Sequence, residues 1–175
     1  MNILGTFLPG IIKNFRTYKG LGDKTIAQLR EQEINFRQDE HSNSMALIVK
    51  HMHGNMISRW TDFLTSDGEK PDRNRDREFD GDIADKASML KLWEEGWACL
   101  FHALESLKEE DLGRTVYIRS EAHTVLEAVT RQVMHYSYHV GQMVYLGKLI
   151  RGGSFQSLSI PKGKSEEFNK GMLKK

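Results

Sequence analysis

The segment from Thr124 to the Gly152-Gly153 pair constrains the fold most strongly, because it reads as one long helix with two apolar faces. Thr124-Val-Leu-Glu127 is a capping box, which is typical of a helix start, and a glycine pair is typical of a helix end. One face carries Thr124, Ala128, Arg131, His135, His139, Gln142, Leu146 and Leu149, and the other carries Val125, Val129, Val133, Tyr136, Val140, Met143 and Val144. A helix that is apolar on two sides packs against more than one layer. It is therefore central in a helical domain or contacts a second subunit.

The rest of the chain contains three further segments with helical periodicity. Helices are expected at about residues 6–31, 44–64 and 83–109, a loop at 65–82, a short strand or hairpin segment at 115–119, and an irregular tail at 154–175. Gly20 and Gly22 interrupt the first helix, so that we expect one kinked helix or two short ones. Four long amphipathic segments with one minor strand predict an all-α, four-helix bundle, with residues 1–175 as a single domain.

Composition limits the partners and the compartment. A net charge of +1 gives no long-range attraction to nucleic acid or to an anionic membrane. The single cysteine, Cys99, excludes an intramolecular disulfide and a multi-thiolate zinc site, and its helical context predicts a small core residue. No run approaches the roughly 20 apolar residues that span a bilayer, and the N-terminus lacks the basic region of a signal peptide. We therefore expect a cytoplasmic protein that binds neither nucleic acid nor membrane.

Three histidines suggest a metal site. His135 and His139 lie four residues apart, so that their side chains stack on one helix face with about 5–6 Å between their Cβ atoms. This spacing lets two imidazoles bind one ion, although such pairs also occur by chance. On the second helix, His51 falls inside an apolar arc that includes Leu47 and Met52, which turns it towards the interior. Metal sites in helical bundles are built from side chains on facing helices, so all three histidines are candidate ligands.

The ligand set points to an open site. Three neutral imidazoles leave one or more coordination positions of an ion free, as catalytic metal sites do. No carboxylate occupies the motif, so a di-iron site of the Glu-x-x-His type is not supported. Imidazole ligands suit zinc, nickel, iron or copper. His53, His102 and His123 are not expected to contribute.

These motifs resemble the DinB-like (YfiT-like) metal-dependent superfamily, and more narrowly a branch of it known only as a domain of unknown function. The likeness rests on Ser44-Met-Ala-Leu-Ile-Val-Lys-His51, Gly54-Asn55, Arg59-Trp60, His135-Tyr-Ser-Tyr-His139-Val-Gly-Gln142 and Leu158-Ser-Ile-Pro161-Lys-Gly163, and covers essentially the whole chain. It implies that His51, His135 and His139 are the ligands of one divalent ion. Nickel and zinc are the leading candidates, with iron and manganese behind them. The resemblance also implies up-down-down-up connectivity and a homodimer.

The resemblance gives a first hypothesis for the activity. Characterised relatives include transferases and isomerases that use a low-molecular-weight thiol, alongside proposed hydrolases and many proteins without an assigned activity. We therefore expect a metal-dependent thiol S-transferase, because a coordinated thiol readily loses its proton. Arg131 is the candidate to pair with a carboxylate of the thiol. Gln142 and Asn55 are candidates to position substrate or water.

Two alternatives stay open. Metal-activated water would make the protein a hydrolase. Asp62 is a conceivable base for that reaction, but it lies three turns from His51 on the expected helix. A non-catalytic metal-binding or stress-response protein would need the ligands alone. All three readings use the same histidines, so these residues do not separate them.

Overall fold

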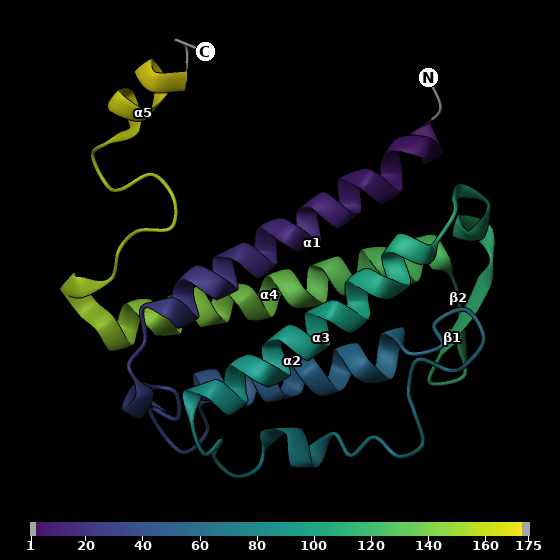
Figure 1. Cartoon of the computed structure of the whole chain (residues 1–175), viewed down its shortest axis with the longest axis horizontal. Coiled ribbons are helices and arrows are strands. Elements are labelled where there is room, and N and C mark those ends of the chain that lie inside the picture. Colours follow the sequence, from purple (N-terminus) through teal and green to yellow (C-terminus); the bar gives the residue numbers. More distant parts are fainter. Residues whose placement is uncertain (1–2, 173–175) are drawn as a thin grey trace.

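The computed structural model describes residues 3–172 and is mostly helical. The long helices are α1 (Ile3–Ala27), α2 (Met45–Trp60), α3 (Lys86–Ser106) and α4 (Val125–Arg151), and a short α5 (Ser165–Met172) follows. Strands β1 (Thr115–Ile118) and β2 (Glu121–Thr124) form an antiparallel hairpin, and 3₁₀ turns lie at Glu31–Glu33, Asp76–Phe79, Glu109–Gly113 and Gly152–Ser154. Figure 1 shows α1 to α4 side by side, with the hairpin at one end and α5 standing apart. The predicted helical class and minor hairpin are confirmed.

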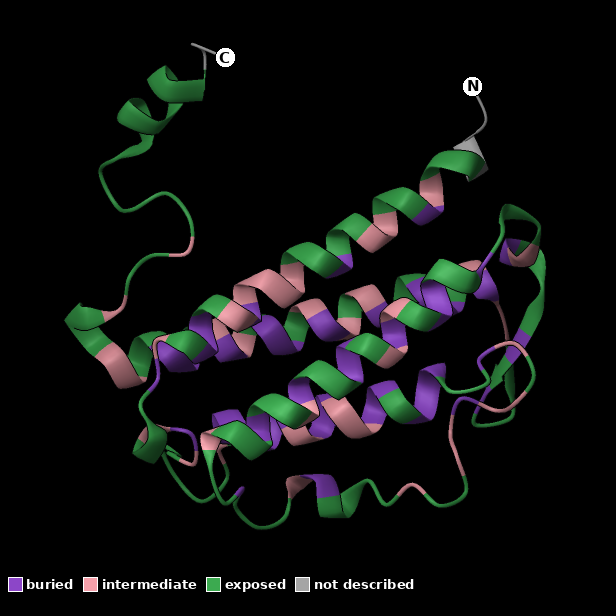
Figure 2. Cartoon of the chain, in the orientation of Figure 1, coloured by how far each residue is buried: buried purple, intermediate pink, exposed green. Residues whose placement is uncertain are grey.

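The inward faces of the four long helices share one apolar core, visible as the buried bands in Figure 2. Phe15 of α1 lies at its centre. The Phe15 ring contacts the rings of Trp60 on α2, Trp97 on α3 and Tyr136 on α4, at centroid distances of 6.4, 6.3 and 6.0 Å. Full burial of an aromatic side chain of this kind stabilises the fold by roughly 1.5–3 kcal/mol. This cluster therefore ties all four long helices together.

The first helix is continuous through Gly20 and Gly22, so it is one helix and not two short ones. Gly22 instead marks a close contact between helices. A Cβ atom at Gly22 would lie 2.4 Å from Cζ2 of Trp93, so only glycine lets the indole pack there. Asp23, the next residue, accepts a hydrogen bond from Trp93 Nε1 at 2.6 Å.

The starts of α2 and α4 agree with the sequence, whereas the end of α2 and both bounds of α1 and α3 differ by three or four residues. Ser44 caps α2 by accepting a hydrogen bond from Leu47 N, and Thr124 and Glu127 form the predicted capping box of α4. The second helix ends at Trp60 and the third covers residues 86–106, both shorter than expected. The expectation of an irregular tail is wrong for residues 165–172, which form α5. None of the described helices is both long and apolar enough to cross a membrane.

The second apolar face of α4 is buried within this chain. Val125, Val129, Tyr136 and Met143 have no exposed surface, because α4 packs against α1 and α2. The central position is therefore the correct one of the two placements that the sequence allowed, and this face gives no support for a second subunit. A different set of α4 residues, Met134, Tyr138 and Tyr145, is more than half exposed.

Candidate metal centre

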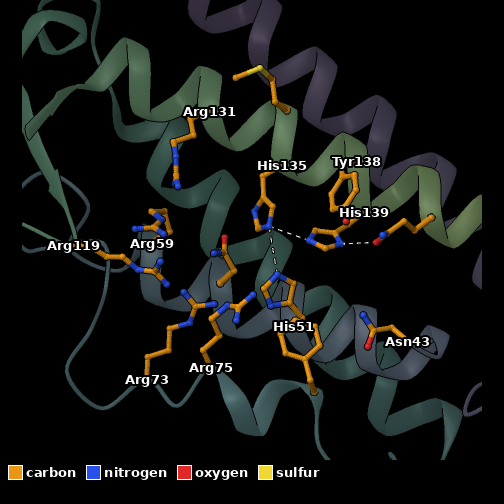
Figure 3. A pocket seen from close by; sticks show the side chains of 14 residues that line it. Asn43, His51, Arg59, Arg73, Arg75, Arg119, Arg131, His135, Tyr138 and His139 are labelled. Atoms are coloured by element: carbon orange, nitrogen blue, oxygen red, sulfur yellow. Dashed lines mark hydrogen bonds between the residues drawn. The ribbon is translucent and has the colours of Figure 1, made fainter. Parts of the chain in front are cut away.

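Helices α2 and α4 bring the three predicted histidines together. His51 comes from α2, and His135 and His139 come from successive turns of α4. The Nε2 atom of His135 lies 3.4 Å from Nε2 of His51 and 3.0 Å from Nε2 of His139. The ligand atoms of all three residues lie within 4.8 Å of one another, and Figure 3 shows their rings converging on one point. Two nitrogens bound to a tetrahedral zinc ion lie about 3.3 Å apart, so this spacing fits a single ion.

The opposite nitrogen of each ring is held by an oxygen acceptor. His51 Nδ1 donates to Glu78 Oε2 at 2.8 Å, and His139 Nδ1 donates to Gln142 Oε1 at 2.8 Å. His135 Nδ1 donates more weakly to Gln132 Oε1 at 3.3 Å. A neutral imidazole that carries its proton on Nδ1 presents a lone pair at Nε2. The three Nε2 lone pairs thus face a common point, and a cation at that point relieves their mutual repulsion.

Burial keeps the α4 histidines in the form that binds metal. Loss of solvent, followed by the charges of the neighbouring histidines, lowers the pKa of His135 from 6.5 to about 3. Loss of solvent likewise lowers the pKa of His139 to about 4. Both rings are therefore neutral at pH 7, as a ligand must be.

Glu78, from the 3₁₀ turn Asp76–Phe79, was not predicted. Its carboxylate is buried and accepts hydrogen bonds from His51 Nδ1 and from Arg73 Nε and Nη2, the last two at 2.7 and 2.9 Å. Burial opposes ionisation of Glu78, but the bonds from His51 and Arg73 outweigh it and lower the pKa of the carboxyl. A carboxylate behind a ligating histidine fixes the ring and raises its basicity. The loop at residues 65–82 therefore builds part of the site.

A buried chain of hydrogen bonds orients Asn55. Trp60 Nε1 can only donate, and it donates to Tyr136 Oη at 3.1 Å. The Tyr136 hydroxyl proton then goes to Asn55 Oδ1 at 2.9 Å. The Asn55 oxygen therefore already accepts a hydrogen bond. Asn55 also lines the cavity beside His51, so its amide N–H groups are available to donate to a ligand there.

The centre opens into a cavity of about 700 Å³. Arg131, Gln142 and Asn55, the three residues predicted to position substrate or water, all line it. Arg131 is one of five arginines in the lining, and Figure 3 shows their side chains gathered to one side of the histidines. No aspartate or glutamate is among the described residues of the lining.

Asp62, Cys99 and the histidines outside the triad do not line the cavity. Asp62 sits beyond the end of α2, and His53, His102 and His123 are not among the residues that line the cavity. The Nε2 atom of His53 lies 3.5 Å from Oε2 of Glu95 on α3, and His53 is half-buried. Cys99 is half-buried, and burial raises the pKa of its thiol, which argues against a nucleophile.

Comparison with known proteins places the chain in a family but gives no activity. No curated protein matches it. A family model described as a protein of unknown function (DUF1572) matches residues 2–164, which is most of the chain. The chain therefore belongs to the DUF1572 family of proteins of unknown function.

Proposed function

We propose that this chain is a metal-dependent S-transferase that binds one divalent ion through His51, His135 and His139. The observation that carries the proposal is the convergence of three Nε2 atoms, each backed by an acceptor on Nδ1, at the wall of an open cavity. A divalent ion held there would lower the pKa of a low-molecular-weight thiol so that it reacts as the thiolate at neutral pH. Zinc and nickel are the leading candidates for the ion.

The protein's own residues would bind and orient the two reactants. Arg131 would pair with a carboxylate of the thiol, and the Asn55 amide would donate to the electrophile. The sulfur forms a bond to the electrophilic carbon, the leaving group departs with its electron pair, and the thiol proton passes to solvent. Hydrolysis is less well supported, because none of the described lining residues is a carboxylate that could act as base.

A thiol panel tests the proposal. Protein loaded with zinc or nickel is mixed with glutathione, bacillithiol, mycothiol or cysteine and the electrophile monochlorobimane. We expect conjugation above the uncatalysed rate with at least one thiol, and its loss on chelation and in His135→Ala, with His102→Ala as the matched control. Metal-dependent ester hydrolysis without conjugation would favour the hydrolase instead. Metal binding with neither activity would favour a non-catalytic metal-binding role.

We further assign the chain to the DinB-like superfamily, as an up-down-down-up four-helix bundle. Support comes from the two motifs that place the histidines on α2 and α4 and from the courses of the four long helices in Figure 1. We also propose a cytoplasmic location, where low-molecular-weight thiols are kept reduced.

A homodimer is part of the same proposal. The exposed α4 residues Met134, Tyr138 and Tyr145 form an apolar face, and the first two also line the cavity. A second copy seated there would cover the rim of the site. Sedimentation of the wild type is expected to give a dimer at micromolar concentration, and Tyr145→Glu is expected to give monomers. A wild-type monomer would rule out this assembly.

A further inference from the structure

Five arginines from four parts of the chain meet on one side of the metal-binding histidines. Arg59 comes from α2, Arg73 and Arg75 from the loop at residues 65–82, Arg119 from the hairpin turn and Arg131 from α4. Figure 3 shows Arg131 reaching in from one side, Arg119 from another, and Arg73 and Arg75 from below. They therefore surround the same space from several directions.

The hairpin turn is fixed in place by a carboxylate. Arg119 and Ser120 form the two-residue turn between β1 and β2, and both have positive φ, at 55° and 63°. The Asp67 carboxylate accepts the backbone N–H groups of Arg119 and Ser120 at 2.9 and 2.7 Å. These bonds hold the turn against the loop that carries Arg73. They therefore fix the position of the Arg119 backbone beside the cavity.

The nearby carboxylates do not balance these arginines. Glu69 Oε2 lies 3.0 Å from Arg73 Nη1, 3.4 Å from Arg119 Nε and 3.8 Å from Arg59 Nη2, so one carboxylate is shared by three guanidinium groups. Glu78 is already bound by Arg73 and His51. With Asp67 included, three carboxylates face five arginines, which leaves an excess of two positive charges.

Two of the five guanidinium groups lack adequate partners. Arg59 is only 3% exposed, and its Nε and Nη1 atoms are buried without a hydrogen bond. Its one ion pair within residues 3–172, to Glu69 at 3.8 Å, is longer than a hydrogen bond. Arg131 makes no hydrogen bond or ion pair with another residue between 3 and 172, and its exposed side chain lines the cavity. Arg59 is thus a buried charge without an adequate partner, which is costly, and Arg131 adds an unpaired charge at the cavity surface, so the arrangement favours a bound anion.

We infer that Arg59, Arg119 and Arg131 form a binding site for a small dianionic oxyanion group carried by the reactant that Arg131 contacts. The excess of two charges matches a dianion, and guanidinium groups from three directions suit an acceptor with oxygens on several sides. Phosphate esters and dicarboxylates share this chemistry. The inference rests on the proposed function in one respect, namely that the anchored group would hold the rest of the substrate at the histidines.

Titration calorimetry on metal-free protein tests the site without any contribution from a metal ion. The probes are inorganic phosphate and succinate, with acetate and chloride as monoanions at equal ionic strength. We expect phosphate or succinate to bind measurably and the monoanions not to bind. Binding of phosphate alone would identify a phosphate ester as the substrate class, and binding of succinate alone would identify a dicarboxylate. Binding of neither dianion would overturn the inference.

Variants locate the site. Arg131→Gln and Arg119→Gln change exposed side chains, and each is expected to weaken dianion binding about tenfold or more, because each removes charge-assisted hydrogen bonds. Arg59→Lys keeps the charge but replaces the planar guanidinium group and its several N–H donors, and it is expected to weaken binding similarly. Arg16→Gln is the matched control, because Arg16 is an exposed arginine that pairs with Glu105 outside the cavity. Unchanged binding in both Arg131→Gln and Arg119→Gln would overturn the inference, even if Arg59→Lys failed to fold.

The two proposals fail separately. Metal content and thiol conjugation can be measured on the same preparations as dianion binding. A metal-loaded, active protein without dianion affinity would overturn only the arginine site. Dianion binding by a protein that takes up no metal would overturn only the metal-dependent activity.

Discussion

At the scale of single residues, the candidate centre depends on what lies behind the ligands. Each imidazole points Nε2 at the common centre, and its Nδ1–H donates a hydrogen bond to an oxygen of Glu78, Gln132 or Gln142. Glu78 is the only charged member of this set, and Arg73 holds it in place. These contacts decide which nitrogen of each ring is free to bind metal.

Glu78→Gln is expected to weaken metal binding about 10- to 100-fold, because the amide keeps the shape but removes the charge behind His51. It should also lower the free energy of unfolding, since Arg73 would be left buried with a poorer partner. Competition against a zinc-binding dye measures the affinity. Glu69→Gln is the control, because Glu69 contacts arginines but no histidine. Equal affinities of Glu78→Gln and the wild type would show that this carboxylate does not tune the site.

The depressed pKa values of His135 and His139 set how acid acts on metal binding. Protons compete with metal only as the pH approaches the pKa of the metal-free ring, which is about 3 for His135 and about 4 for His139. The logarithm of the zinc dissociation constant is therefore expected to change little between pH 7.5 and pH 5.5 on account of these two residues. If both rings had the ordinary pKa of about 6.5, up to two protons would compete with each zinc ion below that pH. The logarithm of the dissociation constant would then rise by up to two for each unit decrease in pH.

The same shifts bear on the stability of the metal-free protein. Both pKa values are lower in the folded chain than in the unfolded one, so the unfolded chain binds more protons between about pH 6.5 and pH 4. The contribution of these two neutral rings to the free energy of unfolding is fully present above pH 6.5, and it is lost as the pH falls through that window.

At the scale of elements, α2 fits against the loop at residues 65–82 through a glycine. A Cβ atom at Gly54 would lie 2.4 Å from Glu78 Oε1 and 2.8 Å from its Cδ. Glu78 cannot easily move away, because Arg73 and His51 hold both of its oxygens. Gly54 therefore lets the loop bring its carboxylate onto the helix that carries His51.

Gly54→Ala is expected to displace the Glu78 carboxylate and to weaken metal binding by about 10-fold or more without changing a ligand. The affinity is again read by dye competition. Gly20→Ala is the matched control, because nothing lies within 4 Å of a Cβ atom placed at Gly20 in α1. The control should keep its metal affinity and gain up to about 1 kcal/mol of stability from helix propensity. A Gly54→Ala protein with wild-type affinity would contradict this role of the loop.

The elements also explain what could be predicted from the sequence. The periodicity of apolar residues gave the four long helices and turned His51, His135 and His139 inward, because helix geometry is local. Gln132 and Gln142 lie three residues from His135 and His139 on the same helix, so the i, i+3 rule could have identified them as partners. Glu78 and the five-arginine cluster could not be found in this way. Their positions depend on how a non-periodic loop and a hairpin turn dock, which local pattern does not encode.

At the scale of the whole molecule, we expect the fold to form without a metal ion. The core is formed by aromatic and aliphatic side chains from all four long helices, whereas the ligands come from two of them. Zinc fingers, by contrast, are unfolded without metal.

Removal of the ion with a chelator is therefore expected to leave the helical circular dichroism intact and to lower Tm. A hundredfold excess of metal over its Kd stabilises by about 2.7 kcal/mol, which corresponds to about 5–10 °C for a chain of this size. His102→Ala should show the same loss as the wild type, and His135→Ala should show almost none. Loss of the helical signal on chelation would show that the ion is structural and would remove the main support for an enzyme.

The most direct measurement of the central claim is the metal content of purified protein after equilibrium dialysis against zinc or nickel. We expect one ion per chain in the wild type and strongly reduced content in His51→Ala, His135→Ala and His139→Ala, because two imidazoles hold an ion much less tightly than three. The matched controls His53→Ala, His102→Ala and His123→Ala should keep one ion. Full occupancy in His135→Ala, or a wild type that binds no ion, would contradict the three-histidine centre.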